Sequence, residues 1–119
     1  MIIYNVTVNI EDASHDDWLE WMKTTHIPDV MKSGLFFACR ILKLHTRHEE
    51  ETGTTYAIQY ACRSMEEYER YQRDFAPALQ AETRRLYEGK FVAFRTVMEE
   101  VFEYASDPPH AAHGESGEV

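Results

Sequence analysis

The sequence is short of positive charge and has no clustered glycines, and both shortages exclude classes of function. Only 12 Lys and Arg stand against 21 Asp and Glu, which gives a formal net charge of -9. Nucleic acids and anionic membranes are bound largely through Lys and Arg, so neither is an expected partner. The five glycines form no Gly-rich cluster ahead of a helix, so we expect no phosphate-binding loop.

Cysteine is almost absent as well. The two cysteines, Cys39 and Cys62, fall in predicted strands, and they face each other if the hairpin between them turns around Glu50 and Glu51. Because disulfides are rare in the cytosol, we interpret both as buried free thiols, with a disulfide or redox role as the alternative. Neither cysteine has a spaced histidine, and the sequence has no Gly-x-Ser-x-Gly motif, so nothing indicates a nucleophile.

No apolar run is long enough to span a membrane. The N-terminal run lacks the basic region of a signal peptide and is interrupted by Asn5, Thr7 and Asn9, so we interpret it as a strand. A cytoplasmic location is therefore expected.

The periodic segments that are present follow the order strand, helix, strand, strand, helix, strand. This order is typical of the α+β ferredoxin-like fold, in which two helices cover one face of a four-stranded antiparallel sheet. The other face needs a partner, so we expect a homodimer whose two sheets close into an α+β barrel. The predicted strands span residues 2–10, 35–46, 54–62 and 91–102, and the helices open at capping boxes that begin at Ser14 and Ser64.

The length suits one domain. A chain of 119 residues that is 44% hydrophobic can build one core but not two. From Tyr104 onward the composition changes to Ser, Pro, His, Gly and Glu, which bury little surface. We therefore predict a domain over residues 1–103 and a disordered acidic tail over residues 104–119.

The first predicted helix carries the leading candidate for a functional residue. Its apolar stripe runs through Leu19, Met22 and His26, and Pro28 predicts a helix break or kink just beyond. His26 could contact a ligand or act as a general acid–base in the gap between helix and sheet. The alternative is that it caps carbonyls in the last turn of the helix.

Aromatic residues supply further candidates for ligand contact. Trp18 and Trp21 flank the helix stripe, either as core residues or as a ligand platform. The period-two pattern turns Tyr4, Tyr56 and Tyr60 toward the helices, where they could position a ligand.

Strand parity also predicts a polar set on the bare face of the sheet. We expect this set to line a dimer interface or the interior of the barrel. The same parity places Phe94 and Met98 in the core, and Ile3, Phe91 and Val97 on the bare face. The predicted polar residues are Asn5, Thr7, Asn9, Arg40, Gln59 and Arg95.

Two histidine pairs, His45-x-x-His48 and His110-x-x-His113, have spacings that suggest a metal site. No third ligand accompanies either pair, so we expect no metal. No cofactor is expected either.

Several stretches together form a recognisable family pattern. They are the run from Met1 to Ile10, the helix motif Trp18-x-x-Trp21-Met22-x-x-x-His26-Ile27-Pro28, and the strands Thr55 to Tyr60 and Phe91 to Thr96. The pattern covers residues 1 to about 102 and resembles a family of short bacterial proteins of unknown function.

More remotely, the His-x-Pro ending of the helix resembles the dimeric α+β barrel superfamily. That superfamily includes antibiotic-biosynthesis monooxygenases, ether-degradation proteins and rhamnose mutarotases. Only His26 is reached by the shared motif, and the pocket pattern of haem-degrading members is not found.

Three functions remain open. We favour a module that binds a small aromatic or anionic metabolite. The second hypothesis is a cofactor-independent monooxygenase or isomerase, with His26 as acid–base and Tyr4, Tyr56 or Tyr60 positioning the substrate. The third is an interaction or stress-associated protein without a ligand.

Overall fold

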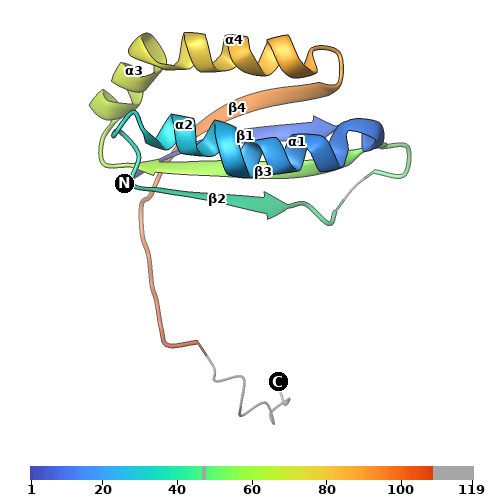
Figure 1. Ribbon diagram of the computed structural model, residues 1–119. Helices are drawn as coiled ribbons and strands as arrows, with labels where there is room; N and C mark the ends of the chain where they lie inside the picture. Colours follow the sequence, from blue (N-terminus) through green and yellow to red (C-terminus); the bar gives the residue numbers. More distant parts are fainter. Residues whose placement is uncertain (47, 109–119) are drawn as a thin grey trace, which may run out of the picture.

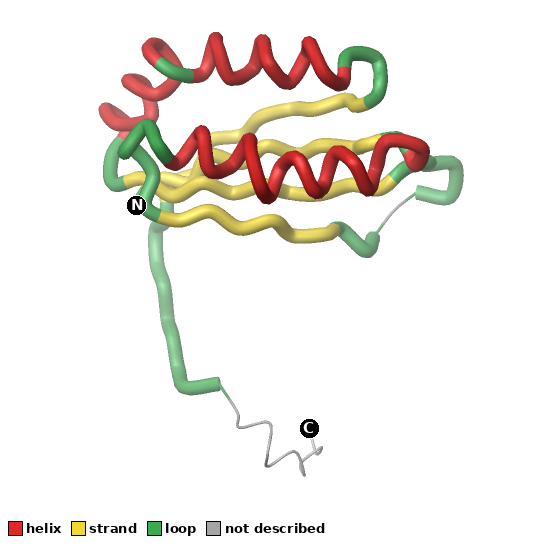
Figure 2. The backbone as a smooth tube through the Cα atoms, in the orientation of Figure 1, coloured by secondary structure: helices red, strands yellow, loops and turns green. Residues whose placement is uncertain are grey.

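The structure is a computed structural model that describes residues 1–46 and 48–108. It has one four-stranded antiparallel sheet in the order β2-β3-β1-β4, with the helices on one face (Figures 1 and 2). This confirms the predicted ferredoxin-like α+β fold. The strands are β1 (Ile2–Ile10), β2 (Ala38–Lys43), β3 (Thr54–Cys62) and β4 (Phe91–Glu99).

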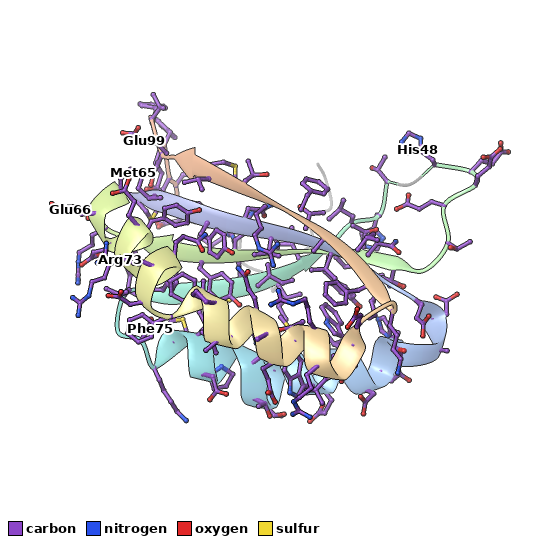
Figure 3. The ribbon with its side chains drawn as sticks, turned by 90° about the horizontal axis from the view of Figure 1, so that it is seen from above. His48, Met65, Glu66, Arg73, Phe75 and Glu99 are labelled. Atoms are coloured by element: carbon purple, nitrogen blue, oxygen red, sulfur yellow. The ribbon has the colours of Figure 1, made fainter. Side chains whose placement is uncertain are left out.

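The helices form a single layer that covers one face of the sheet (Figure 1). Seen from above, α4 and the helical run from α1 to α2 lie side by side, and the labelled Met65 and Glu99 mark the end opposite His48 (Figure 3). The helical elements are α1 (His15–Trp21), a π-helical turn (Met22–His26), α2 (Ile27–Met31), α3 (Met65–Asp74) and α4 (Ala76–Tyr87). No helix among the described residues is long and apolar enough to cross a membrane.

Of the predicted break or kink at Pro28, the break is wrong, because the helical run continues through a π turn. The N–H of Ile27 bonds the carbonyl of Met22, five residues back, and Pro28 becomes the second residue of α2. Proline lacks an N–H and its ring crowds the carbonyl four residues before it, so a local widening of the helix accommodates it. The widened turn ends at His26, and such turns are frequent at functional sites.

One of the two predicted capping boxes forms. The N–H of Glu67 donates to Ser64 Oγ at 3.2 Å, so α3 begins as predicted. Ser14 makes no such bond, because its hydroxyl donates to Glu11 Oε2 at 2.7 Å inside a 3-10 turn over Asp12–Ser14.

The hairpin between β2 and β3 pairs two residues out of the predicted register. Cys39 lies opposite Tyr60, and Cys62 lies opposite Ile2 on β1, so the two thiols are not direct neighbours. Both cysteines are free. A shift of two keeps every side chain on its face, so Arg40 remains on the bare face, where it lies opposite Gln59.

The predicted phase of β4 is wrong by one residue. Arg95 lies opposite Val6, and Phe94 lies opposite Thr7. Arg95 therefore shares the helix-covered face with the β1 core residues, while Phe94 turns to the bare face.

The other apolar side chains of β4 whose face was predicted also lie on the opposite face. Phe91 and Val97 pair with Ile10 and Tyr4 on the covered face, whereas Met98 pairs with Ile3, which stays on the bare face as predicted. This strand is apolar on both faces, so alternation alone does not fix its phase. The register with β1 does.

The core lies between the covered face and the helices. Trp18, Ile10, Ile58, Val30 and Cys62 are its most completely buried side chains. Residues 104–108, where the predicted tail begins, are exposed and form no helix or strand. The predicted disorder of the remainder, and the His110 and His113 pair, lie outside the described residues.

Candidate functional site

A cleft opens between the covered face of the sheet and the helices. It encloses about 50 Å³, room for a few water molecules. Its floor comes from the helix-facing side chains of three strands, because residues at alternate positions of a strand point to the same face. The floor residues are Tyr4, Val6, Val8, Ile58, Tyr60, Phe91, Ala93 and Arg95.

The walls and roof come from three helical segments. Leu79 and Thr83 are four residues apart on α4, so they line the cleft from one helix face. The other residues from the helices are Trp18, Met22, His26, Tyr71 and Gln80. His26, Trp18, Tyr4 and Tyr60, which the sequence predicted as site residues, thus meet in one cleft.

His26 lies half-buried at the end of the π turn. Its ring stacks on Trp21 with the centroids 4.9 Å apart. Burial lowers the pKa of His26, the carboxylate of Asp29 opposes that shift, and the positive charge of Arg95 adds to it. The imidazole is therefore neutral at pH 7 and can accept a proton at one nitrogen and donate one at the other.

Within the described part of the chain, no group hydrogen-bonds a ring nitrogen of His26. The capping alternative requires a bond to a helix carbonyl, which is not seen there. Its nitrogens are therefore open to a ligand.

Arg95 is the cationic side chain of the cleft. Its Nε donates to Tyr4 Oη at 3.1 Å. The Tyr4 ring, only 3% exposed, packs against the rings of Tyr60, Tyr68 and Tyr71, so the anchor of the guanidinium is rigid. The predicted proximity of Arg95 to Asn5, Asn9 or Gln59 does not occur, because those residues face the other side of the sheet.

Two further tyrosines give the cleft neutral hydroxyl groups. Burial raises the pKa of Tyr60 and of Tyr71 above the ordinary value, although the charge of Arg95 opposes the shift at Tyr71. Both phenols therefore stay protonated at neutral pH and can donate to a ligand.

Trp21 and Tyr56 do not line the cleft. Trp21 backs His26 from outside and contacts Tyr87. The Tyr56 hydroxyl bonds His15 Nε2 at 2.6 Å and so fixes the start of α1 on β3. In this structure Trp21 positions His26, while Tyr56 supports the fold.

The bare face holds a chain of hydrogen bonds among the predicted polar residues. Arg40 Nε donates to Gln59 Oε1 at 3.1 Å, Gln59 Nε2 donates to Asn5 Oδ1 at 3.2 Å, and Asn5 Nδ2 donates to Thr7 Oγ1 at 2.9 Å. Asn9 lies further along and donates to the Thr52 carbonyl and Thr55 Oγ1. The predicted grouping therefore holds for every member except Arg95.

Apolar side chains surround this polar chain. Val92 is 70% exposed and Phe94 is 64% exposed, and both belong to β4. Leu42 and Met98 are exposed on the same face. The bare face is thus more apolar than the sequence predicted, since Phe94 and Met98 were assigned to the core.

Sequence reasoning missed Gln80 and Thr83, which contribute polar atoms to the cleft. Their spacing of three, next to the apolar Leu79, could have indicated a shared helix face. Among the described residues, no group of three or more His, Cys, Asp or Glu side chains could hold a metal ion.

Solved structures of the same fold cover most of this chain. A MhuD mutant with two manganese protoporphyrin IX molecules per active site matches with a TM-score of 0.61, 15% identity, and coverage of 89% of this chain and 100% of the other. A dimeric ferredoxin-like protein from an uncultured marine organism matches with a TM-score of 0.53 and 14% identity, and the match covers 84% of this chain and 97% of the other. The monooxygenase from the gene ActVA-Orf6 of Streptomyces coelicolor, in complex with nanaomycin D, matches with a TM-score of 0.52 and 15% identity. That match covers 87% of this chain and 92% of the other.

At these identities the matches show the fold alone, a ferredoxin-like α+β fold. No curated protein matches the sequence. The profile of one family matches residues 1–101. The chain therefore belongs to the family described as a domain of unknown function (DUF4286).

Proposed function

We propose that this protein binds a small molecule in the cleft between its helices and its sheet. The observation that carries this proposal is the combination of an apolar floor with the unpaired imidazole of His26 and the guanidinium of Arg95. Binding sites for small molecules are typically apolar concavities with a few polar groups that fix orientation. The enclosed 50 Å³ is smaller than an aromatic ring, so a ring-sized ligand would have to extend through the open side of the cleft.

The structures that share the fold are consistent with this proposal. One holds protoporphyrin in its active site, and another holds nanaomycin D. Fold analogy is a weak guide to the ligand, so the cleft itself supports the choice. A porphyrin is much larger than the enclosed space, and we propose no haem here.

The second candidate is a cofactor-independent enzyme of the monooxygenase or isomerase type. The neutral His26 favours it, because a neutral imidazole can take a proton from a bound substrate. The cationic Arg95 would stabilise negative charge that develops on that substrate. The Tyr4, Tyr60 and Tyr71 hydroxyls would position it.

We also propose that the protein is a homodimer through its bare face. An exposed face that combines Val92, Phe94 and Met98 with a hydrogen-bonded polar chain resembles a protein interface more than a solvated surface. A similar fold is described as dimeric. The third hypothesis, an interaction protein without a ligand, keeps this dimer and leaves the cleft empty.

The cytoplasmic location expected from the sequence remains part of the proposal. The two free cysteines support it, because thiols stay reduced in that compartment. The net charge of -9 supports the expectation that nucleic acid and anionic membranes are not partners.

A comparison of two histidine variants tests the site. We expect His26→Ala to weaken the best hit of a thermal-shift screen about tenfold, because an imidazole contact of roughly 1.4 kcal/mol is lost. The free energy of unfolding should fall by about 0.5 to 1.5 kcal/mol, because the ring stacking on Trp21 is lost. His45→Ala, outside the cleft, is the matched control and should change neither quantity.

Two results would contradict this assignment. Unchanged affinity in His26→Ala would remove His26 from the site. A loss of stability with intact affinity would show that His26 has only a structural role, as the stacking partner of Trp21 or as a helix cap. If the screen finds no ligand for the wild type, the interaction hypothesis gains.

A further inference from the structure

Arg95, like Arg40 and Arg84, has no described acidic partner, whereas the other four described arginines have one, and of the three only Arg95 lines the cleft. Arg63, Arg70, Arg73 and Arg85 each lie within 4.0 Å of a carboxylate. No described carboxylate lies that close to Arg95, although the sequence has 21 Asp and Glu. An unpaired guanidinium in a strongly acidic chain is available to an anion from outside.

The geometry also leaves the correct atoms of Arg95 free. A guanidinium has five N–H donors in a rigid fork. Only Nε is used within the described chain, by Tyr4 Oη at 3.1 Å, so the four donors on the two terminal nitrogens remain. A pair of parallel N–H donors matches the two oxygens of a carboxylate.

The surroundings specify the charge and shape of the ligand. His26 is neutral, so Arg95 provides the single positive charge of the cleft, which suits a monoanion. The floor beside Arg95 is formed by Val6, Phe91 and Ala93, which present apolar surface to the rest of the ligand. A phosphate dianion would be left with one uncompensated charge.

We propose that Arg95 makes the cleft a receptor for small monocarboxylates with a flat apolar body. The carboxylate lies against the terminal nitrogens of Arg95, and the body lies along the apolar floor and extends through the open side of the cleft, because the enclosed 50 Å³ is smaller than a ring. This inference rests on the proposed function, since it requires that the cleft binds a small molecule.

Benzoate and its neutral analogue benzamide form a matched pair of probes. Both have one aromatic ring, and they differ mainly in charge. We expect the wild type to bind benzoate about tenfold more tightly than benzamide, as measured by NMR titration of the full chain. A charge-assisted hydrogen bond of roughly 1.5 to 3 kcal/mol supports at least this ratio.

Three variants test whether Arg95 causes the preference for benzoate over benzamide. Arg95→Gln should weaken benzoate about tenfold and leave benzamide within about twofold, because the charge is lost and the apolar floor is kept. Arg95→Lys keeps the positive charge but loses the paired N–H donors of the guanidinium. Its affinity for benzoate should therefore lie between those of the wild type and Arg95→Gln. Arg40→Gln removes an arginine from the bare face and should leave both affinities unchanged. In the wild type, benzoate should also shift the Nε–H resonance of Arg95.

Each contrary result has a distinct meaning. Equal affinity of the wild type for benzoate and benzamide would overturn the inference and leave the proposed function standing. A benzoate preference that persists in Arg95→Gln would also overturn it, because the carboxylate would then bind elsewhere. No binding of either probe at millimolar concentration would count against the proposed cleft function, and the inference would fall with it.

Discussion

The helix-covered face and the bare face of the sheet are built from alternate residues of the same strands, but they differ in whether their polar groups are hydrogen-bonded within the chain. On the bare face, Arg40, Gln59 and Asn5 satisfy one another in a chain of hydrogen bonds. On the covered face, Arg95 and His26 keep donors or acceptors without a described partner. Under the proposed function, these free donors and acceptors are the groups that meet the ligand.

The apolar residues of the two faces differ in whether the chain itself buries them. Those of the covered face, such as Ile58, are buried by helices of the same chain. Those of the bare face, such as Phe94, are left exposed by the chain itself. The covered face is buried within one chain, whereas in the proposed dimer the bare face is covered by a second chain.

The largest effect should come from a charge on the bare face. Phe94→Asp should convert the dimer entirely to monomer, because an unpaired carboxylate would be buried between the sheets. Light scattering at micromolar concentration measures the mass. Met65→Asp, which changes an exposed methionine on α3, is the control and should leave the dimer intact. A wild type with the mass of one chain would contradict the proposed barrel.

Adjacent residues of β3 give the next largest contrast. Ile58→Ala should lower the free energy of unfolding by about 2 to 5 kcal/mol, because a side chain only 1% exposed is removed from the core. Gln59→Ala should cost about 0.5 to 1.5 kcal/mol, since it removes hydrogen bonds to Arg40 and Asn5 on the other face. Urea denaturation of both variants measures the difference. Equal losses would show that the two faces are equally well packed.

The fold was predictable because most strands alternate clearly. Asn5, Thr7 and Asn9 interrupt an otherwise apolar strand, and this fixes the phase of β1. In β4, Phe91 and Phe94 lie at positions of opposite parity, so either phase buries a phenylalanine. Only the pairing with β1, a long-range contact, selects the phase that turns Arg95 toward the helices.

The site was predictable only in part for the same reason. His26 could be located because it lies on the helix stripe, and local periodicity is visible in sequence. Arg95 and Tyr4 are 91 positions apart in the sequence, and they meet only because β1 and β4 pair in the sheet. The π turn was also invisible, because its cause, Pro28, is compatible with either a break or a widened helix.

A smaller effect should appear in the titration of His26, and it tests which face holds Arg95. Because Arg95 lowers the pKa of His26 and Asp29 raises it, Arg95→Gln should raise that pKa and Asp29→Asn should lower it further. NMR of the imidazole protons measures both shifts. An unchanged pKa in Arg95→Gln would mean that the guanidinium does not face the cleft.

The same titration predicts how stability depends on pH. In the folded state the pKa of His26 is lowered from 6.5, so the unfolded chain binds the proton more readily. The neutral imidazole thus contributes stability that is present above pH 6.5 and lost as the pH falls through the folded pKa. Each unit of lowering corresponds to about 1.4 kcal/mol. Relative to His26→Ala, the wild type should lose stability over this window, and a constant difference would contradict the sign.

The smallest effect should come from removal of residues 104–119. Beyond β4 the chain runs away from the sheet on the side opposite the helices (Figure 1), and Tyr104 is 84% exposed. Because the described part of this segment buries so little surface, a chain that ends at Glu103 should lose less than about 1 kcal/mol of unfolding free energy. Urea denaturation of the full and shortened chains measures this change, and light scattering of the same samples reports whether the dimer persists. A larger loss of stability, or a shortened chain that becomes monomeric, would show that the segment packs against the bare face of a partner and that the domain does not end at Glu103.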